Sequence, residues 1–77
     1  MTLREKISKI TINLGIATEK VKKNYFAYLI NQAEDLLEKD FQRGYKCFRE
    51  AEGLGIDMDL STLIRIGDLR IKYSKNL

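Results

Sequence analysis

The first part of the chain carries an apolar pattern with the period of an α-helix. Apolar side chains recur four, three, four, three and four residues apart, at Leu3, Ile7, Ile10, Leu14, Ala17 and Val21. This spacing places them on one side of a helix. Thr2 and Glu5 form a capping-box pair at its start, and Gly15 suits its end. Residues 10–14 alternate apolar and polar side chains, so a strand is the alternative there, but the cap and the longer stripe favour helix.

The middle of the chain predicts two helices joined by a short connection. Thr18 can cap the first, which extends to about Glu38 without an interrupting Gly or Pro. Asp40 can cap the second, which ends at Gly53 and Gly55. Apolar or small residues at helical spacing form one side of each, at Val21, Tyr25, Tyr28, Leu29, Ala33, Leu36 and Leu37, and then at Phe41, Gly44, Tyr45, Phe48 and Ala51. A connection of two or three residues forces the two helices into an antiparallel hairpin.

The last segment predicts a fourth helix capped by Asp57 or Asp59. Its main stripe consists of Leu60, Leu63, Ile64, Gly67 and Ile71, with Ile66 and Tyr73 beside it. A β-hairpin over residues 64–73 is the alternative, because a Gly-Asp pair suits a two-residue turn. Helix is favoured, since three preceding helices need a helical partner more than an isolated hairpin.

Together these elements predict an all-α fold, a small three- to four-helix bundle with a central antiparallel helical hairpin. The chain has 77 residues, of which 44% are hydrophobic and 32% charged, and it contains no Pro. This composition is typical of a globular protein rather than a disordered one. We therefore expect a single helical domain over residues 1–77.

The absence of His and the presence of one Cys restrict the chemistry available to the chain. A Ser-His-Asp or Cys-His nucleophile and a zinc site with His and Cys ligands are excluded. The Gly53-Leu54-Gly55 segment lacks the Lys and the length of a phosphate-binding loop. We predict no catalytic residue, no metal ligand and no cofactor, and hence no enzyme. Cys47 has basic neighbours that favour a reactive thiolate, but a packing role is the expectation.

Residues 33–73 resemble part of a tetratricopeptide-type repeat. Phe41, Gly44, Phe48 and Ala51 have the spacing of an aromatic, a small, a large and an Ala residue in the second helix of that repeat. Ile66-Gly67-Asp68-Leu69 is similar to a first-helix segment in which Gly permits close helix packing. Residues 32–41 and 44–48 are also similar to small archaeal helical proteins of unknown function. These resemblances imply a helical-hairpin fold, not an activity.

Charge is distributed unevenly along the chain. Residues 1–25 have a net charge of +4 (six basic, two acidic), residues 26–59 of −4 (four basic, eight acidic), and residues 60–77 of +3 (four basic, one acidic). Basic ends and an acidic middle suit an acidic partner or a second copy of the chain. We predict a non-enzymatic protein-interaction module whose partner is another protein or a second copy of itself, in a dimer; a monomer that exposes a few apolar residues is the alternative. Off-stripe apolar residues and charged residues are the predicted partner-binding set: Ile12, Ile16, Glu34, Glu38, Asp68 and Lys72.

The alternative function is that of a small nucleic-acid-binding accessory protein. Exposed aromatic side chains beside Lys and Arg can stack on bases, and basic helix faces can neutralise phosphates. The predicted contacts are Lys22, Lys23, Phe26, Arg43, Lys46 and Arg49. This alternative is not favoured, because helical spacing already explains most of the aromatic residues as core.

No targeting or membrane-spanning segment is evident in the sequence. Charged residues interrupt the apolar residues of the first segment every few positions, so neither a signal peptide nor a membrane span is predicted. We expect a cytoplasmic protein without a membrane partner.

Overall fold

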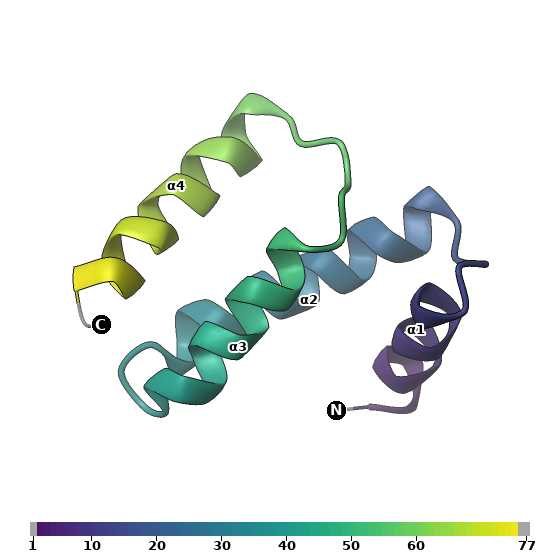
Figure 1. Ribbon diagram of the computed structural model, residues 1–77, viewed down its shortest axis with the longest axis horizontal. Coiled ribbons are helices and arrows are strands. Elements are labelled where there is room, and N and C mark those ends of the chain that lie inside the picture. The colour runs from purple at the N-terminus through teal and green to yellow at the C-terminus, as the bar shows by residue number, and fades with distance from the viewer. Residues whose placement is uncertain (1, 76–77) are drawn as a thin grey trace.

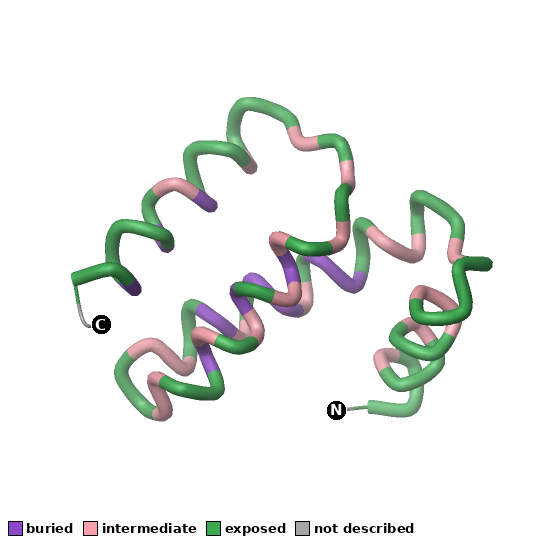
Figure 2. The backbone as a smooth tube through the Cα atoms, viewed as in Figure 1, coloured by how far each residue is buried: buried purple, intermediate pink, exposed green. Residues whose placement is uncertain are grey.

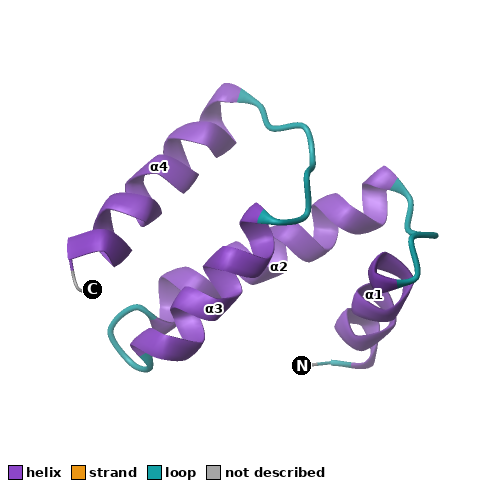
Figure 3. Cartoon of the chain, in the orientation of Figure 1, coloured by secondary structure: helices purple, strands orange, loops and turns teal. Residues whose placement is uncertain are grey.

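Four α-helices follow one another in the computed structural model, which describes residues 2–75 (Figure 1). They are α1 (Leu3–Asn13), α2 (Glu19–Leu36), α3 (Phe41–Glu52) and α4 (Leu60–Lys75). No strand forms within residues 2–75 (Figure 3). The all-α prediction is confirmed, and residues 10–13 and 64–73 are helical rather than extended.

A side-chain oxygen caps the start of each helix, because the first backbone N–H groups of a helix have no partner within it. The pairs are Thr2 with the N–H of Glu5 at 3.4 Å, Thr18 with Val21 at 3.3 Å, Asp40 with Arg43 at 3.3 Å and Asp59 with Thr62 at 2.8 Å. The last cap is therefore Asp59, and its hydrogen bond from the Thr62 backbone lowers the pKa of the Asp59 carboxyl. The reciprocal half of the capping box at Thr2 is not formed, since Oε2 of Glu5 is buried without a hydrogen-bond partner.

Helix ends differ slightly from the sequence expectation. α2 ends at Leu36, where the carbonyl accepts a hydrogen bond from the Asp40 N–H at 2.8 Å, two residues before the predicted Glu38. Gly15 and Gly55 have φ values of +76° and +67°, which side chains other than Gly rarely adopt. Gly53, in contrast, caps α3 in a right-handed conformation.

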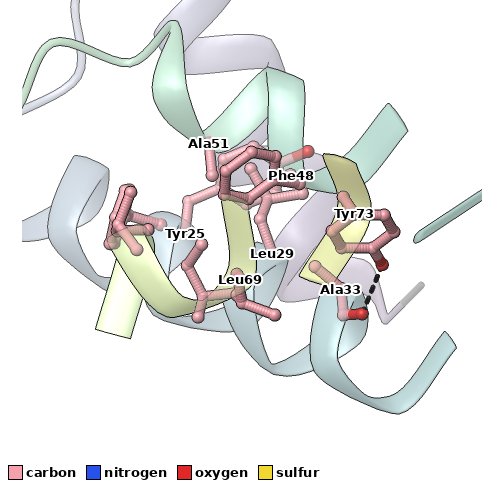
Figure 4. Packing of buried hydrophobic residues seen from close by; sticks show 10 residues of the cluster. Tyr25, Leu29, Ala33, Phe48, Ala51, Leu69 and Tyr73 are labelled. Carbon is pink, nitrogen blue, oxygen red and sulfur yellow. Dashed lines mark hydrogen bonds between the residues drawn. The ribbon is translucent and has the colours of Figure 1, made fainter. Parts of the chain in front are cut away.

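α2 and α3 form the predicted antiparallel hairpin, and α4 packs along it on the side away from α1 (Figure 1). Within residues 2–75, the buried hydrophobic residues lie on these three helices (Figure 2). They are Tyr25, Phe26, Leu29, Ile30 and Ala33 of α2, Phe48 and Ala51 of α3, and Ile66, Leu69 and Tyr73 of α4 (Figure 4). The core of the described chain is thus built from the hairpin and one face of α4.

Tyr73 of α4 is buried in this core and is 1% exposed. Its ring centroid lies 5.2 Å from that of Phe41, 5.7 Å from Tyr45 and 5.6 Å from Phe48. Its hydroxyl donates a hydrogen bond to the carbonyl of Ala33, which satisfies the one polar atom that the ring brings inside (Figure 4). Tyr73 therefore ties the last turns of α4 to both helices of the hairpin.

Gly44 leaves room for Tyr73. A Cβ at Gly44 would overlap the Tyr73 hydroxyl and lie 3.0 Å from Cβ of Leu36. Gly44 therefore faces α2, where its neighbour is Leu36. Gly67 differs, because a Cβ there would meet no atom within 4 Å. The close packing at Gly67 that the tetratricopeptide resemblance implies does not occur, since Gly67 lies on the outer side of α4.

Two arginine pairs fix α4 along its edges. Arg65 binds the carboxylate of Glu34 on α2 and donates to Oδ1 of Asn31 at 2.7 Å. Arg70 donates to Oε2 of Glu52 on α3 through Nη2 at 2.6 Å and through Nε at 3.2 Å. These pairs join α4 to both helices of the hairpin, one pair to each.

α1 packs on α2 with far less support. No residue of α1 is buried, and Ile12 is the side chain of α1 that packs against the core. Lys9 forms an ion pair with Glu50 of α3 at 3.4 Å, and the same carboxylate accepts a hydrogen bond from the Tyr25 hydroxyl at 2.7 Å. α1 is thus attached by one partly buried apolar side chain and a polar cluster.

Candidate interaction surface

The most regular apolar side of α1 faces away from the hairpin. Its members are 52–73% exposed and are named here the α1 stripe: Leu3, Ile7, Ile10 and Leu14. The opposite side of α1, which faces the hairpin, carries the partly buried Glu5, Ser8 and Ile12. In the single chain, the more apolar side of α1 is therefore the solvated one.

α4 has the same arrangement. The side predicted as its main stripe is exposed, and its large members, 53–73% exposed, are named here the α4 stripe: Leu60, Leu63, Ile64 and Ile71. The neighbouring side carries Ile66, Leu69 and Tyr73, which are 1–4% exposed. Two terminal helices thus each present an apolar face that nothing in the described chain covers.

The sequence-based choice of outer faces was wrong for three residues. The spacing placed Ile66 and Tyr73 beside the main stripe of α4 and outside the expected core face, but both are buried in the core. Ile12 was expected to bind a partner, but it packs against the core, whereas Ile16 is 67% exposed as predicted. The reason is that the hairpin surrounds the Tyr73 ring with aromatic side chains and offers its hydroxyl a carbonyl acceptor. The aliphatic side chains of the α4 stripe have no hydroxyl that could use this acceptor.

Among the charged members of the predicted partner-binding set, Lys72 lies near both Glu38 and Asp68, whereas Glu34 is apart from them. Glu34 is bound to Arg65 within the chain. Glu38 lines a shallow depression with Lys72, at the end of the molecule where α2 meets the last turns of α4. Asp68 is paired with Lys72 at 3.0 Å, on an exposed part of α4. Asp68 and Lys72 both lie on α4, close in sequence to Ile71 of the α4 stripe, and Glu34 serves to hold α4.

A basic groove lies where α1, α2 and α3 meet. Its volume is about 310 Å³, and Lys9, Arg43 and Lys46 line it together with Cys47 and Glu50. Arg43 and Lys46 are the two predicted nucleic-acid contacts that the fold brings together. Lys9 was not predicted, because its place in the groove depends on how α1 packs, which its own sequence pattern does not show.

The other predicted nucleic-acid contacts do not join this groove. Phe26 is 5% exposed and belongs to the core, so the expectation that it stacks on bases is wrong. Arg49 is paired with Glu52 at 3.3 Å. Lys22 is half-buried on the first turns of α2. Lys23 lines a separate pocket of about 250 Å³ between α2 and the start of α4, beside Asp59.

Cys47 and Tyr25 of the basic groove have perturbed proton affinities. Burial, with the charge of Glu50, raises the pKa of the Cys47 thiol despite its basic neighbours. Burial and the hydrogen bond to Glu50 raise the pKa of the Tyr25 hydroxyl well above its usual value. Both groups are therefore protonated at neutral pH, which suits a packing role better than nucleophilic chemistry.

Comparison with known proteins identifies no family model, no curated protein and no solved structure that matches the chain. In addition, no helix within the described residues is both long enough and apolar enough to span a membrane. Fold and surface are therefore the basis for a functional proposal.

Proposed function

We propose that the chain is a non-enzymatic protein-interaction module that self-associates. The observation that supports this most is the exposure of both apolar stripes, eight large aliphatic side chains that are each more than half exposed. Scattered exposed apolar residues are normal on a protein surface, but contiguous apolar faces mark interaction sites. Here the exposed residues lie in rows along two helices, so they form faces rather than scattered points.

The chemistry of the polar groups fits a binding role better than catalysis. Tyr25 and Lys9 both bind the carboxylate of Glu50, and the thiol of Cys47 has a raised pKa. The most buried polar contact, from Tyr73 to Ala33, ties helices together. These groups stabilise the fold. The apolar stripes remain in contact with water, and their burial against a partner would be favourable.

Sedimentation equilibrium over a micromolar concentration range tests self-association. We expect the wild-type chain to have a mass above that of one chain, and Ile7→Glu to lower it. Ile7 is 52% exposed, so the charge should not disturb the monomer, whereas Ile12→Glu would disturb core packing. Gln42→Glu on the exposed side of α3 is the matched control for added charge. A mass of one chain at all concentrations would contradict self-association.

Binding of nucleic acid is the second candidate, supported by the three cations that line one groove. A gel-shift series with single-stranded and duplex DNA and RNA, at low and high salt, tests it. Phosphate contacts weaken steeply as salt rises. A protein that uses this groove should lose the low-salt shift in the Arg43→Gln, Lys46→Gln double variant, and the absence of any low-salt shift would eliminate the candidate.

A further inference from the structure

We propose that the α1 stripe of one copy packs on the α4 stripe of a second copy, so that the chains associate head to tail. This inference rests on the proposed function and adds which surfaces meet. Within residues 2–75, the rows of exposed large apolar side chains lie on α1 and α4. One contact between an α1 stripe and an α4 stripe covers one stripe of each kind.

The spacing of the two stripes matches. Leu3, Ile7, Ile10 and Leu14 lie four, three and four residues apart, and so do Leu60, Ile64, Gly67 and Ile71. This alternation is the seam of a coiled coil, in which side chains of one helix insert between those of another. Such a narrow seam favours another helix as its occupant, because a flat lipid surface takes a wider apolar face. Each copy of the chain has one α1 stripe and one α4 stripe, so the two kinds of surface are present in equal numbers.

The shapes of the two stripes are complementary at their centres. The α1 stripe has a large aliphatic side chain at each of its four positions. On α4, the matching row of Leu60, Ile64, Gly67 and Ile71 has a glycine at its third position, where a Cβ would meet no atom within 4 Å. When the stripes are aligned in parallel, Ile10 lies opposite Gly67, and when they are antiparallel, Ile7 does. In either direction, a branched side chain of α1 meets the recess on α4.

Charge favours a contact between the α1 and α4 stripes over a contact between two α1 stripes. Arg4 and Lys6 occupy the two edges of the α1 stripe, so two α1 stripes in contact would gather cations without a carboxylate between them. Asp68 borders the α4 stripe next to Gly67, and it would meet Lys6 in the parallel arrangement or Arg4 in the antiparallel one. Its present partner, Lys72, is an exposed neighbour one turn away, and such pairs contribute little. Asp68 can therefore serve a second copy at small cost.

The positions of α1 and α4 determine how the association continues. The two helices lie on opposite sides of the α2–α3 hairpin (Figure 1), and each stripe is on the side of its helix away from the core. One pair of copies joined in this way still exposes one α1 stripe and one α4 stripe. A contact between unlike surfaces repeats until a ring closes or an open chain forms.

A mixing experiment with two variants tests this arrangement. Ile7→Glu with Ile10→Glu blocks the α1 stripe, and Ile64→Glu with Ile71→Glu blocks the α4 stripe. All four positions are 52–64% exposed, so both variants should keep the helical circular dichroism of the wild type. We expect each variant alone to have the mass of one chain in sedimentation equilibrium. Their equimolar mixture should have the mass of two chains and no more, because a single intact pair of stripes remains. Gln42→Glu should associate as the wild type does.

The other outcomes separate this inference from the proposed function. If the α4-blocked variant still associates by itself, α1 stripes pair with each other, and if the α1-blocked variant does, α4 stripes do. Either result overturns the head-to-tail arrangement while leaving self-association intact. The arrangement is also wrong if both variants and their mixture all remain single chains. A wild-type chain that never associates overturns both proposals.

Discussion

α1 and α4 present apolar stripes of the same spacing to solvent, yet the hairpin holds them very differently. α4 contributes three side chains that are 1–4% exposed, and its two arginine pairs contact both helices of the hairpin. α1 contributes no buried residue, and its contacts with the rest of the chain include the partly buried Ile12 and the Lys9–Glu50 pair. An outward apolar face thus says nothing about how firmly a helix is bound. α4 belongs to the core of the single chain, whereas α1 is an accessory to it.

The sharpest test of this difference compares Tyr73→Ala with Ile12→Ala. Loss of a fully buried aromatic side chain costs about 3–5 kcal/mol, enough to unfold a domain of this size. Ile12 is only partly buried, so its truncation should cost about 1 kcal/mol. Urea unfolding followed by circular dichroism measures both. Tyr73→Phe, which removes only the hydrogen bond to Ala33, should cost about 0.5–1.5 kcal/mol. Equal losses for Tyr73→Ala and Ile12→Ala would show that α1 is as integral as α4.

Two glycines test the inner and outer sides of the α4 contact. Gly44→Ala should destabilise the chain by about 1–3 kcal/mol, because its Cβ would displace the buried Tyr73 hydroxyl. Gly67→Ala should stabilise it by about 0.5–1 kcal/mol, because the position is open and Ala is the better helix former. Thermal melts at low concentration give both signs. Stabilisation by Gly44→Ala would mean that α4 sits farther from the hairpin than described.

Alkaline pH tests the polar cluster that holds α1. The pKa of Tyr25 is raised in the folded chain above the ordinary value of about 10. The stability that this provides is fully present below pH 10 and is lost as pH rises toward the folded pKa. The urea midpoint should therefore fall above pH 10, and less so in Tyr25→Phe than in the wild type. Tyr73 has a raised pKa as well, so Tyr73→Phe provides the comparison from α4. An identical pH dependence in Tyr25→Phe and the wild type would exclude a role for Tyr25.

The smallest expected effect concerns the ion pairs themselves. Lys9→Met removes a pair whose side chains are 46% and 35% exposed, and it should cost less than about 1 kcal/mol. Arg70→Met should cost more, because two N–H groups of Arg70 bind a Glu52 carboxylate that is only 19% exposed. Urea unfolding of the two variants ranks them. The reverse order would place more of the attachment in α1 than its contacts indicate.

Local signals in the sequence were sufficient for most of the fold. Thr2, Thr18 and Asp40 cap the helices as predicted, because a cap depends only on residues three positions apart. The hairpin followed from the short connection before Asp40. Helix at residues 64–73 was favoured over a β-hairpin only by the need of the other helices for a partner.

The rotation of α1 and α4 was not predictable from the same signals. α4 carries two apolar sides, and periodicity alone ranked the aliphatic one above the side with Tyr73. What decides between them is a recess at Gly44 and an acceptor at Ala33, both on other helices. On α1, the regular stripe suggested a core face, but Lys9 and Ile12 direct the other side inward. On both helices, the side expected in the core is exposed and the other side faces the core. The candidate interaction residues are therefore those of the α1 and α4 stripes.

The hydrogen bond from the Tyr73 hydroxyl to the Ala33 carbonyl also has a consequence for the order of folding events. The two residues are 40 positions apart, whereas α2 and α3 are joined by a connection short enough to close rapidly. We expect the hairpin to form in the transition state and Tyr73 to dock after it. Substitutions at Tyr73 should then accelerate unfolding and leave the refolding rate nearly unchanged, while substitutions between α2 and α3, such as Ala33→Gly, should slow refolding.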